Sequence, residues 1–240
     1  MADATTKKGK LYLIPSTLGE IPPLEVLPIS IKRAIEEINI YIVENEKTAR
    51  HFIKKLSPRK SQPSLTLYAL NKFTEASEIP NFLNPCLEGN NVGILSEAGC
   101  PGIADPGASV VRIAHEKHIQ VVPLVGPSSI ILALMASGLN GQNFAFNSYL
   151  AIDGAERKKQ IKKLERKSKE ENQSQIFIET PYRNNKLLEE LVRTVSGTTR
   201  ICVACDITLN TEYIRTKTAS EWKGEHVDLH KRPAIFIIQA

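Results

Sequence analysis

Short apolar runs alternate with amphipathic segments along the first part of the chain. Between the runs, residues 30–38 and 47–56 place apolar side chains at helical spacing, and further helical segments follow Gly107 and Gly126-Pro127-Ser128-Ser129. The runs have the length of buried strands and lie at 10–15, 40–43, 65–70, 92–95 and 120–124. Strands that alternate with helices in this way predict a doubly wound, mostly parallel α/β domain.

The second part of the chain repeats this style with different proportions. Its predicted helices are 155–169 and 185–195, and its predicted strands are 144–149, 175–178, 200–204, 211–218 and 233–238. The last three strands have little helix between them, which predicts a mixed sheet with helices. We therefore expect two domains, 1–146 and 147–240, joined by a short boundary near Asn147.

Two turns rich in glycine and proline follow the apolar runs at 92–95 and 120–124. The first turn, Ser96–Gly107, contains three glycines and two prolines, and the second reads V-G-P-S-S. Two strands joined by a crossover helix form a parallel βαβ unit. In open parallel sheets, ligands bind outside the carboxyl ends of the strands. Both turns are therefore expected to face the same crevice.

Composition places the chain among ordinary globular proteins. It has 240 residues, of which 42% are apolar and 24% are charged. No apolar run approaches the roughly 20 residues that span a bilayer, and the first residues lack the apolar core of a signal peptide. We expect a cytoplasmic protein that makes no contact with a membrane.

The basic residues are concentrated in one segment. The net charge of +5 permits a nucleic-acid partner without requiring one. The segment Arg157–Lys169 contains eight basic residues and one acidic residue, and helical spacing turns Ile161 and Leu164 inward. Such a face would neutralise RNA phosphates with salt-sensitive affinity, but it lacks interleaved aromatic residues and equally fits a solvated helix. Both interpretations remain open.

Two of the four cysteines are predicted to be core residues of a strand. Cys202 and Cys205 form a C-x-x-C within the strand-like sequence R-I-C-V-A-C-D-I. Positions three apart on a strand point to opposite faces, which suits neither a disulfide nor a shared metal. The histidine pairs are His115/His118 and His226/His230. Neither pair has a carboxylate or cysteine at a spacing typical of metal ligands, so we expect no metal site.

The turn at Ser96–Gly107 carries a resemblance to a known family. Its sequence, S-E-A-G-C-P-G-I-A-D-P-G, resembles the S-D-A-G-T-P-x-I-S-D-P-G signature of ribosomal RNA ribose 2'-O-methyltransferases, which belong to the tetrapyrrole methylase superfamily. The resemblance extends in order over most of the chain, through Gly9–Glu20, Val121–Ser129, Ala133–Leu139 and Ile176–Arg183.

The resemblance implies two α/β domains, a homodimer, and S-adenosylmethionine bound in the cleft between the domains. On the first domain, the implied cofactor-binding residues are Pro15, Ser96, Glu97, Ala98, Gly99, Ile103 and Asp105. Ser128 and Ser129 would meet the cofactor from the next turn, and Thr180, Pro233 and Ala234 would cover it from the second domain. Glu97 stands where the family usually has Asp.

Methyl transfer from a sulfonium requires mainly that the acceptor be aligned and water excluded. A hydroxyl acceptor would also benefit from a base or a stabilising dipole. Glu44 and Glu179 are the candidate carboxylates, and Arg183 is a candidate phosphate ligand, although each also fits a salt-bridged surface residue. V-E-N-E-K-T-A-R keeps Glu44 but lacks the compact D-T-R of the family's A-E-D-T-R.

Three hypotheses follow. The leading one is an S-adenosylmethionine-dependent methyltransferase acting on ribosomal RNA of the small subunit, at a ribose 2'-oxygen. The departure near Glu44 leaves room for a tetrapyrrole methyltransferase. A non-catalytic RNA-binding relative is the third, because fold alone does not settle function.

Overall fold

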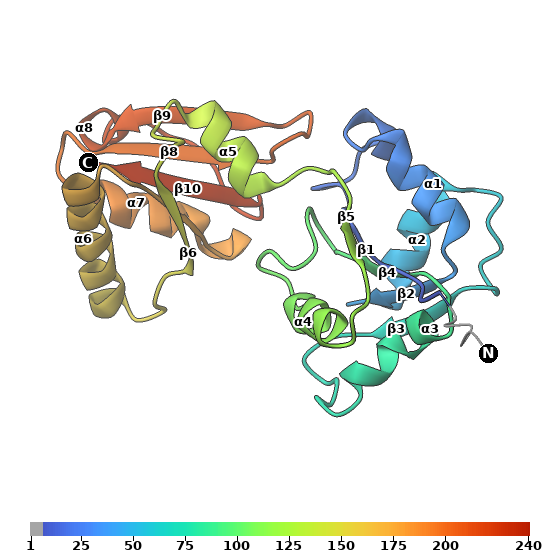
Figure 1. Ribbon diagram of the computed structural model, residues 1–240. Coiled ribbons are helices and arrows are strands. Elements are labelled where there is room, and N and C mark those ends of the chain that lie inside the picture. Colours follow the sequence, from blue (N-terminus) through green and yellow to red (C-terminus); the bar gives the residue numbers. More distant parts are fainter. Residues whose placement is uncertain (1–6) are drawn as a thin grey trace, which may run out of the picture. The chain divides into compact units, whose positions relative to one another are not determined.

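The computed structural model describes residues 7–240 and contains two compact units (Figure 1). The first unit extends to Pro127, and the second is Ser128–Ala240. Each unit has its own five-stranded sheet and its own hydrophobic core.

The sheet of the first unit is entirely parallel, in the order β3-β2-β4-β1-β5. β1 lies between β4 and β5, with Leu11 paired to both Val92 and Val121. The strands are β1 (Leu11–Ile14), β2 (Ile40–Val43), β3 (Thr66–Ala69), β4 (Val92–Leu95) and β5 (Val121–Pro123). The predicted parallel βαβ unit is confirmed, with β1 inserted between its two strands.

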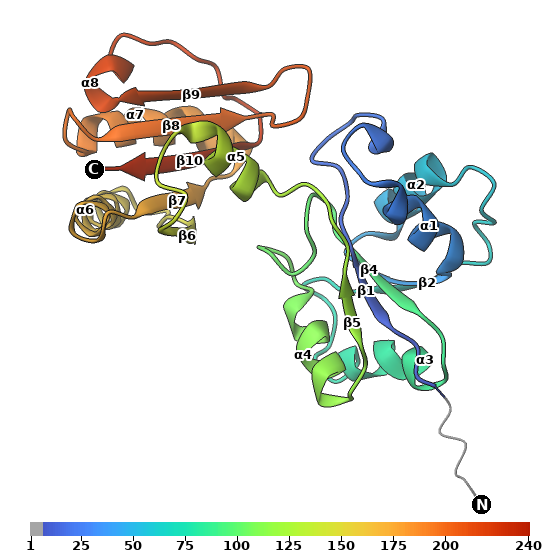
Figure 2. The ribbon, with the colours of Figure 1, turned by 45° about the horizontal axis from the view of Figure 1, so that its top comes forward.

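Helices cover both faces of this sheet (Figure 2). On one face, Ile31, Ile35 and Ile53 of α1 (Ile29–Glu37) and α2 (Glu46–Leu56) are fully buried with Tyr41 of β2. The other face is covered by η2 (Ile79–Leu83), α3 (Asn84–Leu87) and α4 (Ala108–Glu116). A short 3-10 turn, η1 (Pro23–Glu25), precedes α1. This arrangement confirms the predicted doubly wound domain.

The sheet of the second unit is mixed, as predicted. Its order is β6-β7-β10-β8-β9, where β6 and β7 are parallel and all other pairs are antiparallel. The strands are β6 (Phe144–Tyr149), β7 (Ser174–Ile178), β8 (Arg200–Cys205), β9 (Tyr213–Thr218) and β10 (Ala234–Gln239).

One face of this second sheet carries the main core of the unit. Phe177 and Phe236 stack there with ring centroids 6.2 Å apart. The helices that cover this face are α6 (Gly154–Glu171), α7 (Asn184–Thr194) and α8 (Ala219–Trp222), with η3 (Pro181–Arg183) ahead of α7. Cys205 belongs to this cluster, whereas Cys202 is buried outside it, so the two cysteines alternate along β8 as predicted.

The boundary between the units lies earlier than the sequence predicts. α5 (Ser129–Ser137) contacts β8, β9 and β10, and Thr216 Oγ1 donates a hydrogen bond to the Ser137 carbonyl (2.7 Å). The alternation of strands and helices assigned this apolar helix to the first domain. Because it covers the second sheet, the boundary is at Pro127–Ser128 rather than near Asn147. Within residues 7–240, no helix is long and apolar enough to cross a bilayer.

Candidate active site

Loops converge at the carboxyl ends of the strands in the first unit. The Ser16 amide, just after β1, donates to the Gly99 carbonyl in the loop after β4 (3.0 Å). Cys100 of the same loop places its Sγ 3.4 Å from the Pro127 carbonyl oxygen, beyond β5. The turns that follow β1, β4 and β5 therefore form one connected edge, as the sequence predicts for the two Gly/Pro turns.

Asp105 holds the loop at Ser96–Gly107 in its shape. Its Oδ2 accepts a hydrogen bond from Ser96 Oγ (3.0 Å), and its Oδ1 accepts from the amides of Gly107 (3.1 Å) and Gly102 (3.4 Å). Gly99 and Gly102 have φ of +77° and +78°, a conformation that glycine adopts without strain. The side chains of Ser96 and Asp105 thus shape the backbone of their own loop.

Gly126 allows the loop after β5 to pack directly on the end of β1. A Cβ added at Gly126 would lie 2.2 Å from Cβ of Pro15, far inside van der Waals contact. Gly99 also lies close to the same loop, since a Cβ there would lie 3.2 Å from the Pro127 oxygen, a tight contact. Close backbone approach therefore fixes where these turns lie.

A cavity of about 650 Å³ opens beside these loops, within the first unit. Residues 16–20, residues 95–98 and one side of α2 line it. Lys47, His51 and Lys55 are spaced one helical turn apart on α2 and face this cavity together with Phe52. Ser16 also lines it, and its Oγ is buried without a hydrogen-bond partner among the described residues.

Four of the polar groups around this cavity are already paired with one another. Lys55 forms an ion pair with Glu20, and Thr48 Oγ1 donates to Glu97 Oε1 (2.7 Å). Lys47 and His51 take part in neither of these two pairs. The cavity therefore combines the Lys47 ammonium, the His51 imidazole, an unpartnered hydroxyl and an aromatic ring.

Glu44 follows β2 and is half-buried at the same edge. Burial raises the pKa of its carboxyl, and the negative charges of Asp105 and Glu97 raise that pKa further. The carboxylates of Asp105 and Glu97 thus act on Glu44 at this edge. Their combined potential favours a cationic group there, such as a sulfonium.

The predicted residues of the second unit also come together. β7 and β10 pair through Ile178 and Ile235, so Thr180 follows β7 beside the start of β10 at Pro233 and Ala234. Lys231 donates its amide to the Pro181 carbonyl (3.1 Å). Asn184 Nδ2 donates to the Arg232 carbonyl (2.6 Å) and ties the same two segments together.

Glu179 is almost completely buried and already engaged. Its side chain is 3% exposed, and its Oε1 accepts hydrogen bonds from the Thr180 amide and from Arg183 Nη2, both at 2.6 Å. This geometry suits Glu179 to holding the turn after β7 and orienting Arg183. The Arg183 side chain is 35% exposed, which leaves part of the guanidinium accessible.

The structure distributes the predicted site residues over both units. The first unit contains Pro15, Glu44, Ser96, Glu97, Ala98, Gly99, Ile103 and Asp105, and the second contains Ser128, Ser129, Glu179, Thr180, Arg183, Pro233 and Ala234. Ser128 caps α5 by accepting from the Ile131 amide (3.5 Å), and Ser129 is the first residue of that helix. Ile103 is 55% exposed. Cofactor contact by any of these residues stays a prediction.

The sequence reasoning missed the residues of α2 that line the cavity. Lys47, His51 and Lys55 recur every fourth residue, which places them on one face of a helix. This spacing is visible in the sequence. It does not distinguish a face turned to a cavity from a face turned to solvent.

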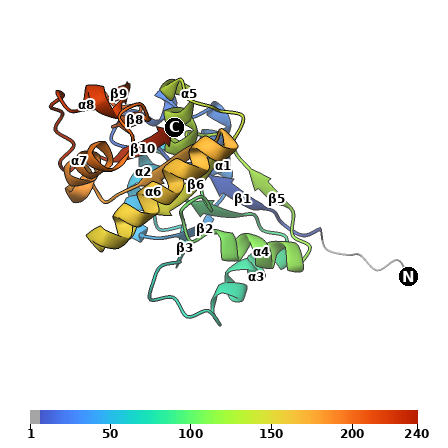
Figure 3. The same cartoon turned by 90° about the vertical axis from the view of Figure 1, so that its left-hand side faces the viewer.

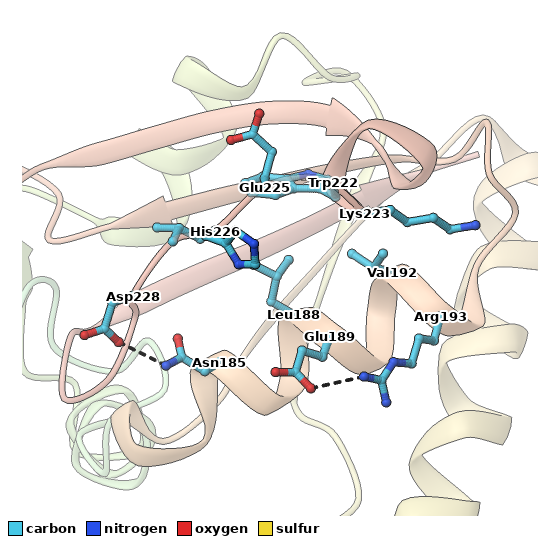
Figure 4. Close-up of a pocket in the computed structure, with 11 residues that line it drawn as sticks. Asn185, Leu188, Glu189, Val192, Arg193, Trp222, Lys223, Glu225, His226 and Asp228 are labelled. Carbon is cyan, nitrogen blue, oxygen red and sulfur yellow. Dashed lines mark hydrogen bonds and ion pairs between the residues drawn. The ribbon is translucent and has the colours of Figure 1, made fainter.

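A second cavity, of about 900 Å³, lies in the second unit (Figure 4). Leu188 and Val192 of α7 lie opposite Trp222 and His226. An ion pair between Glu189 and Arg193 (3.5 Å) lies on the α7 side. The residues that line this cavity include none of the predicted site residues.

The fold defines a class of two-unit α/β proteins. The first unit is all-parallel and doubly wound, with Gly-rich loops at the carboxyl edge of its sheet, and the second unit has a mixed sheet. The chain belongs to the Tetrapyrrole (Corrin/Porphyrin) Methylases, whose family model matches residues 25–223. This membership confirms the superfamily to which the loop at Ser96–Gly107 points.

Relatives and solved structures agree with this assignment. The chain is 28% identical to "Ribosomal RNA small subunit methyltransferase I" of Escherichia coli O157:H7, covering 98% of this chain and 79% of the relative. It is also 28% identical to the protein of that name from Thermotoga maritima, covering 88% and 89%.

Two solved structures share the fold. The methyltransferase CobJ matches with a TM-score of 0.63 at 16% identity, covering 96% of this chain and 94% of that one. Uroporphyrin-III C-methyl transferase from Thermus thermophilus, solved with S-adenyl homocysteine, matches with a TM-score of 0.57 at 17% identity, covering 96% and 97%. The predicted tetrapyrrole-methylase-like fold is confirmed.

Proposed function

We propose that this chain is an S-adenosylmethionine-dependent methyltransferase that methylates ribosomal RNA of the small subunit at a ribose 2'-oxygen. The observation that carries the proposal is the similarity to relatives named as ribosomal RNA small subunit methyltransferases, which spans both units. The solved structures, at 16–17% identity, support the fold alone. The proposed methyl acceptor therefore rests on the relatives of higher sequence identity.

The edge of the first unit fits the cofactor. The loop at Ser96–Gly107 offers glycine backbone that a ligand can approach closely, and Asp105 fixes its shape. The carboxyl groups of Glu44, Glu97 and Asp105 favour a positive charge nearby. S-adenosylmethionine supplies an electrophilic methyl group on a cationic sulfur. The protein's task is then to align the acceptor and exclude water.

The cavity along α2 fits an acceptor nucleotide. Lys47 and His51 suit a phosphate group, and Phe52 offers a surface for a base. An enzyme that modifies a nucleotide within folded RNA can extrude that nucleotide into such a pocket. Glu44 is the carboxyl group proposed to accept the hydroxyl proton, because a raised pKa makes a carboxylate a stronger base.

In the second unit, Arg183 is proposed to hold a phosphate of the substrate. Glu179, whose side chain is buried and bonded to Arg183, positions this guanidinium. Thr180, Pro233 and Ala234, which lie side by side in this unit, are proposed to contact the cofactor, as are Ser128 and Ser129.

We also infer a homodimer that works in the cytoplasm, where ribosomal subunits are found. Ile131 and Met135 lie one turn apart on α5 and are 44% and 74% exposed, which suits an apolar contact with a second copy. Light scattering after size exclusion is expected to give about twice the chain mass of 26.6 kDa. A monomer at micromolar concentration would contradict the dimer and leave the proposed activity standing.

The test of the function uses small ribosomal subunits from cells that lack this chain. The purified protein and methyl-labelled cofactor are expected to label the RNA, and enzymatic digestion should release the label as a 2'-O-methylnucleoside. A porphyrinoid acceptor serves as the second arm. Label on the porphyrinoid and none on RNA would identify a tetrapyrrole methyltransferase. RNA binding without any calorimetric binding of S-adenosylhomocysteine would identify a non-catalytic relative.

A further inference from the structure

The outward side of α6 carries a dense set of cations. In Figure 3, α6 lies in front of the sheet of its own unit with no other segment between it and the viewer. We use "basic face of α6" for its exposed cations, which are Lys158, Lys159, Lys162, Lys163, Arg166 and Lys169. At 3.6 residues per turn these six side chains fall within an arc of about 140°, over about 17 Å of helix.

The fold removes the one carboxylate of this stretch from the basic face. Glu165 is buried, its Oε1 accepts hydrogen bonds from Thr199 Oγ1 (2.7 Å) and from the Ser196 amide, and its Oε2 accepts one from Lys162 Nζ (2.9 Å). Arg157 also turns inward, is 4% exposed, and pairs with Glu190. Between residues 158 and 169 the exposed side chains are therefore all cationic, and one of them, Lys162, pairs with the buried Glu165 (2.9 Å).

This arrangement differs from that of the other amphipathic helices. Each of the following helices pairs a cation with a carboxylate one turn away: α1 through Lys32–Glu36, α2 through Glu46–Arg50, α4 through Arg112–Glu116 and α7 through Glu189–Arg193. On α6 such pairs are Lys162–Glu165 in the middle of the helix, where the Glu165 side chain is buried, and Arg166–Glu170 and Lys167–Glu171 at its carboxyl end.

Four cations of the basic face have no carboxylate oxygen within 4.0 Å among residues 7–240, and they are Lys158, Lys159, Lys163 and Lys169. Like charges one turn apart destabilise a helix, and Lys159 and Lys163 stand in that relation. A solvated helix usually mixes the two signs along its face. The unrelieved repulsion therefore indicates that a polyanion completes the basic face.

The remainder of the chain has no net positive charge comparable to that of α6. Residues 157–169 carry +7 out of a chain total of +5, so the remainder of the chain carries −2. Attraction of the chain to a polyanion is accordingly concentrated on this helix.

The burial of the apolar side of α6 restricts the class of molecule that can bind the basic face. Ile161 is 1% exposed and packs with Phe177 and Leu191 in the core, so the helix has no free apolar face to insert into a bilayer. The basic face contains no aromatic side chain for stacking on bases. Charge without apolar or aromatic contact suits the sugar-phosphate backbone of a nucleic acid.

We propose that the basic face of α6 binds the phosphate backbone of the RNA substrate and holds the RNA independently of its sequence. This inference rests on the proposed function, since it takes the substrate to be RNA. It assigns to α6 the affinity for the substrate, and leaves the methyl transfer to the loops of the candidate active site.

The test replaces Lys158, Lys159, Lys163 and Lys169 together by Gln, which retains helix propensity. Binding of small-subunit RNA is measured at several salt concentrations. Each phosphate contact contributes about 0.7–0.9 to the slope of log K against log salt, so the slope is expected to fall by about 3. The Kd for RNA is expected to rise at least tenfold at 0.15 M salt, while the Kd for S-adenosylhomocysteine stays unchanged.

Two further variants control for folding and for net charge. Arg at the same four positions keeps the charge and is expected to retain the wild-type salt slope. Gln at four exposed cations outside α6 removes the same charge and is expected to retain at least three quarters of the slope. Those four residues are Arg33, Lys54, Arg59 and Lys223.

The outcomes separate this proposal from the proposed function. If the protein methylates RNA but the α6 variant and the scattered control have the same salt slope, the basic face is not the RNA site and the methyltransferase assignment stands. If RNA binding depends on α6 but no methyl group is transferred, the proposed methyltransferase function is overturned and the assignment of the basic face as the RNA-binding surface stands. If the α6 variant loses binding to vesicles of anionic lipid instead of RNA, the proposal is overturned.

Discussion

Asp105 is the residue on which the shape of the Ser96–Gly107 loop depends most. Replacing it by Ala removes the three hydrogen bonds that its carboxylate accepts from Ser96 Oγ and from the amides of Gly102 and Gly107. We expect a loss of about 1–3 kcal/mol in the free energy of unfolding. The affinity for S-adenosylhomocysteine should fall at least about tenfold, which corresponds to about 1.4 kcal/mol.

Calorimetric titration and urea unfolding measure these two quantities. Asp153→Ala is the matched control, because Asp153 caps α6 by accepting from the Glu156 amide (2.9 Å). Its loss should cost about 1 kcal/mol of stability and leave the cofactor affinity unchanged. An Asp105→Ala protein that binds the cofactor as tightly as wild type would show that the loop is not the cofactor site.

Glu44 provides a pH-dependent test. Burial and the charges of Asp105 and Glu97 raise its pKa in the folded state, so the folded protein holds the proton more tightly than the unfolded chain. Ionised Glu44 therefore costs stability fully above its folded pKa, and the cost disappears below the ordinary value of 4.5. Glu44→Gln should raise Tm at pH 7, and the difference from wild type should vanish as the pH falls to about 4.

Scanning calorimetry across this pH range measures the effect, with exposed Glu88→Gln as a control that leaves Tm unchanged. The same Glu44→Gln variant should lose methyl transfer if Glu44 accepts the hydroxyl proton. A variant that is stabilised and fully active would leave Glu44 without a role in catalysis.

At the residue scale, sequence reasoning found the loop residues but not the cavity lining. The glycines and prolines of Ser96–Gly107 predict a turn independently of the surrounding structure, because their backbone preferences are local. Lys47, His51 and Ser16 gain their significance only from the cavity they share. Sequence reasoning left Glu179 as either a catalytic carboxylate or a salt-bridged surface residue, and the structure shows it buried and paired with Arg183.

Gly126 tests the packing of one element on another. An added Cβ would lie 2.2 Å from Cβ and 2.6 Å from Cγ of the rigid Pro15 ring, so the turn after β5 would have to move away from the end of β1. Gly126→Ala is expected to cost about 1–3 kcal/mol in the free energy of unfolding, as overpacking does. Urea unfolding measures this cost.

Gly141→Ala is the control for that substitution, since an added Cβ at Gly141 meets nothing within 4 Å. Its effect should stay within about 0.5 kcal/mol of wild type. If both variants were equally stable, the two turns would not be packed as the structure shows.

At the element scale, the apolar runs predicted several strands and the longer helices closely. β2, β4 and β6 have the predicted bounds, and α2 begins one residue earlier than predicted. The short helices were missed, among them α3 and α8 with four residues each. Four residues are too few to show a period, and such helices are stabilised by caps and burial, as Thr218 and Trp222 do for α8.

Ligand binding gives a prediction for the whole molecule. S-adenosylhomocysteine at 100 times its Kd should stabilise the folded protein by about 2.7 kcal/mol, because a ligand that binds only the folded state shifts unfolding by mass action. The rise in Tm with ligand concentration should follow the Kd found by calorimetry. A Tm that does not change at any concentration would contradict the cofactor assignment, and a porphyrinoid at the same concentrations is expected to have no such effect.

The sequence by itself determined the local structure of this protein. Strand and helix positions follow from the spacing of apolar residues, and the Gly/Pro loop after β4 follows from the backbone preferences of its own residues. The motifs in that loop also pointed to the methylase family, which the family match confirms. These properties are encoded within short windows of the chain, so they can be read without knowing the neighbours.

Only the tertiary structure decided which segments meet. It placed β1 between β4 and β5, gave α5 to the second sheet, and turned Arg157 and Glu165 inward while leaving six cations of α6 outside. It also brought Ser16, Lys47 and His51 around one cavity. The reason is physical. Burial and ion pairing depend on the summed fit of segments distant in sequence, and no single segment contains that information.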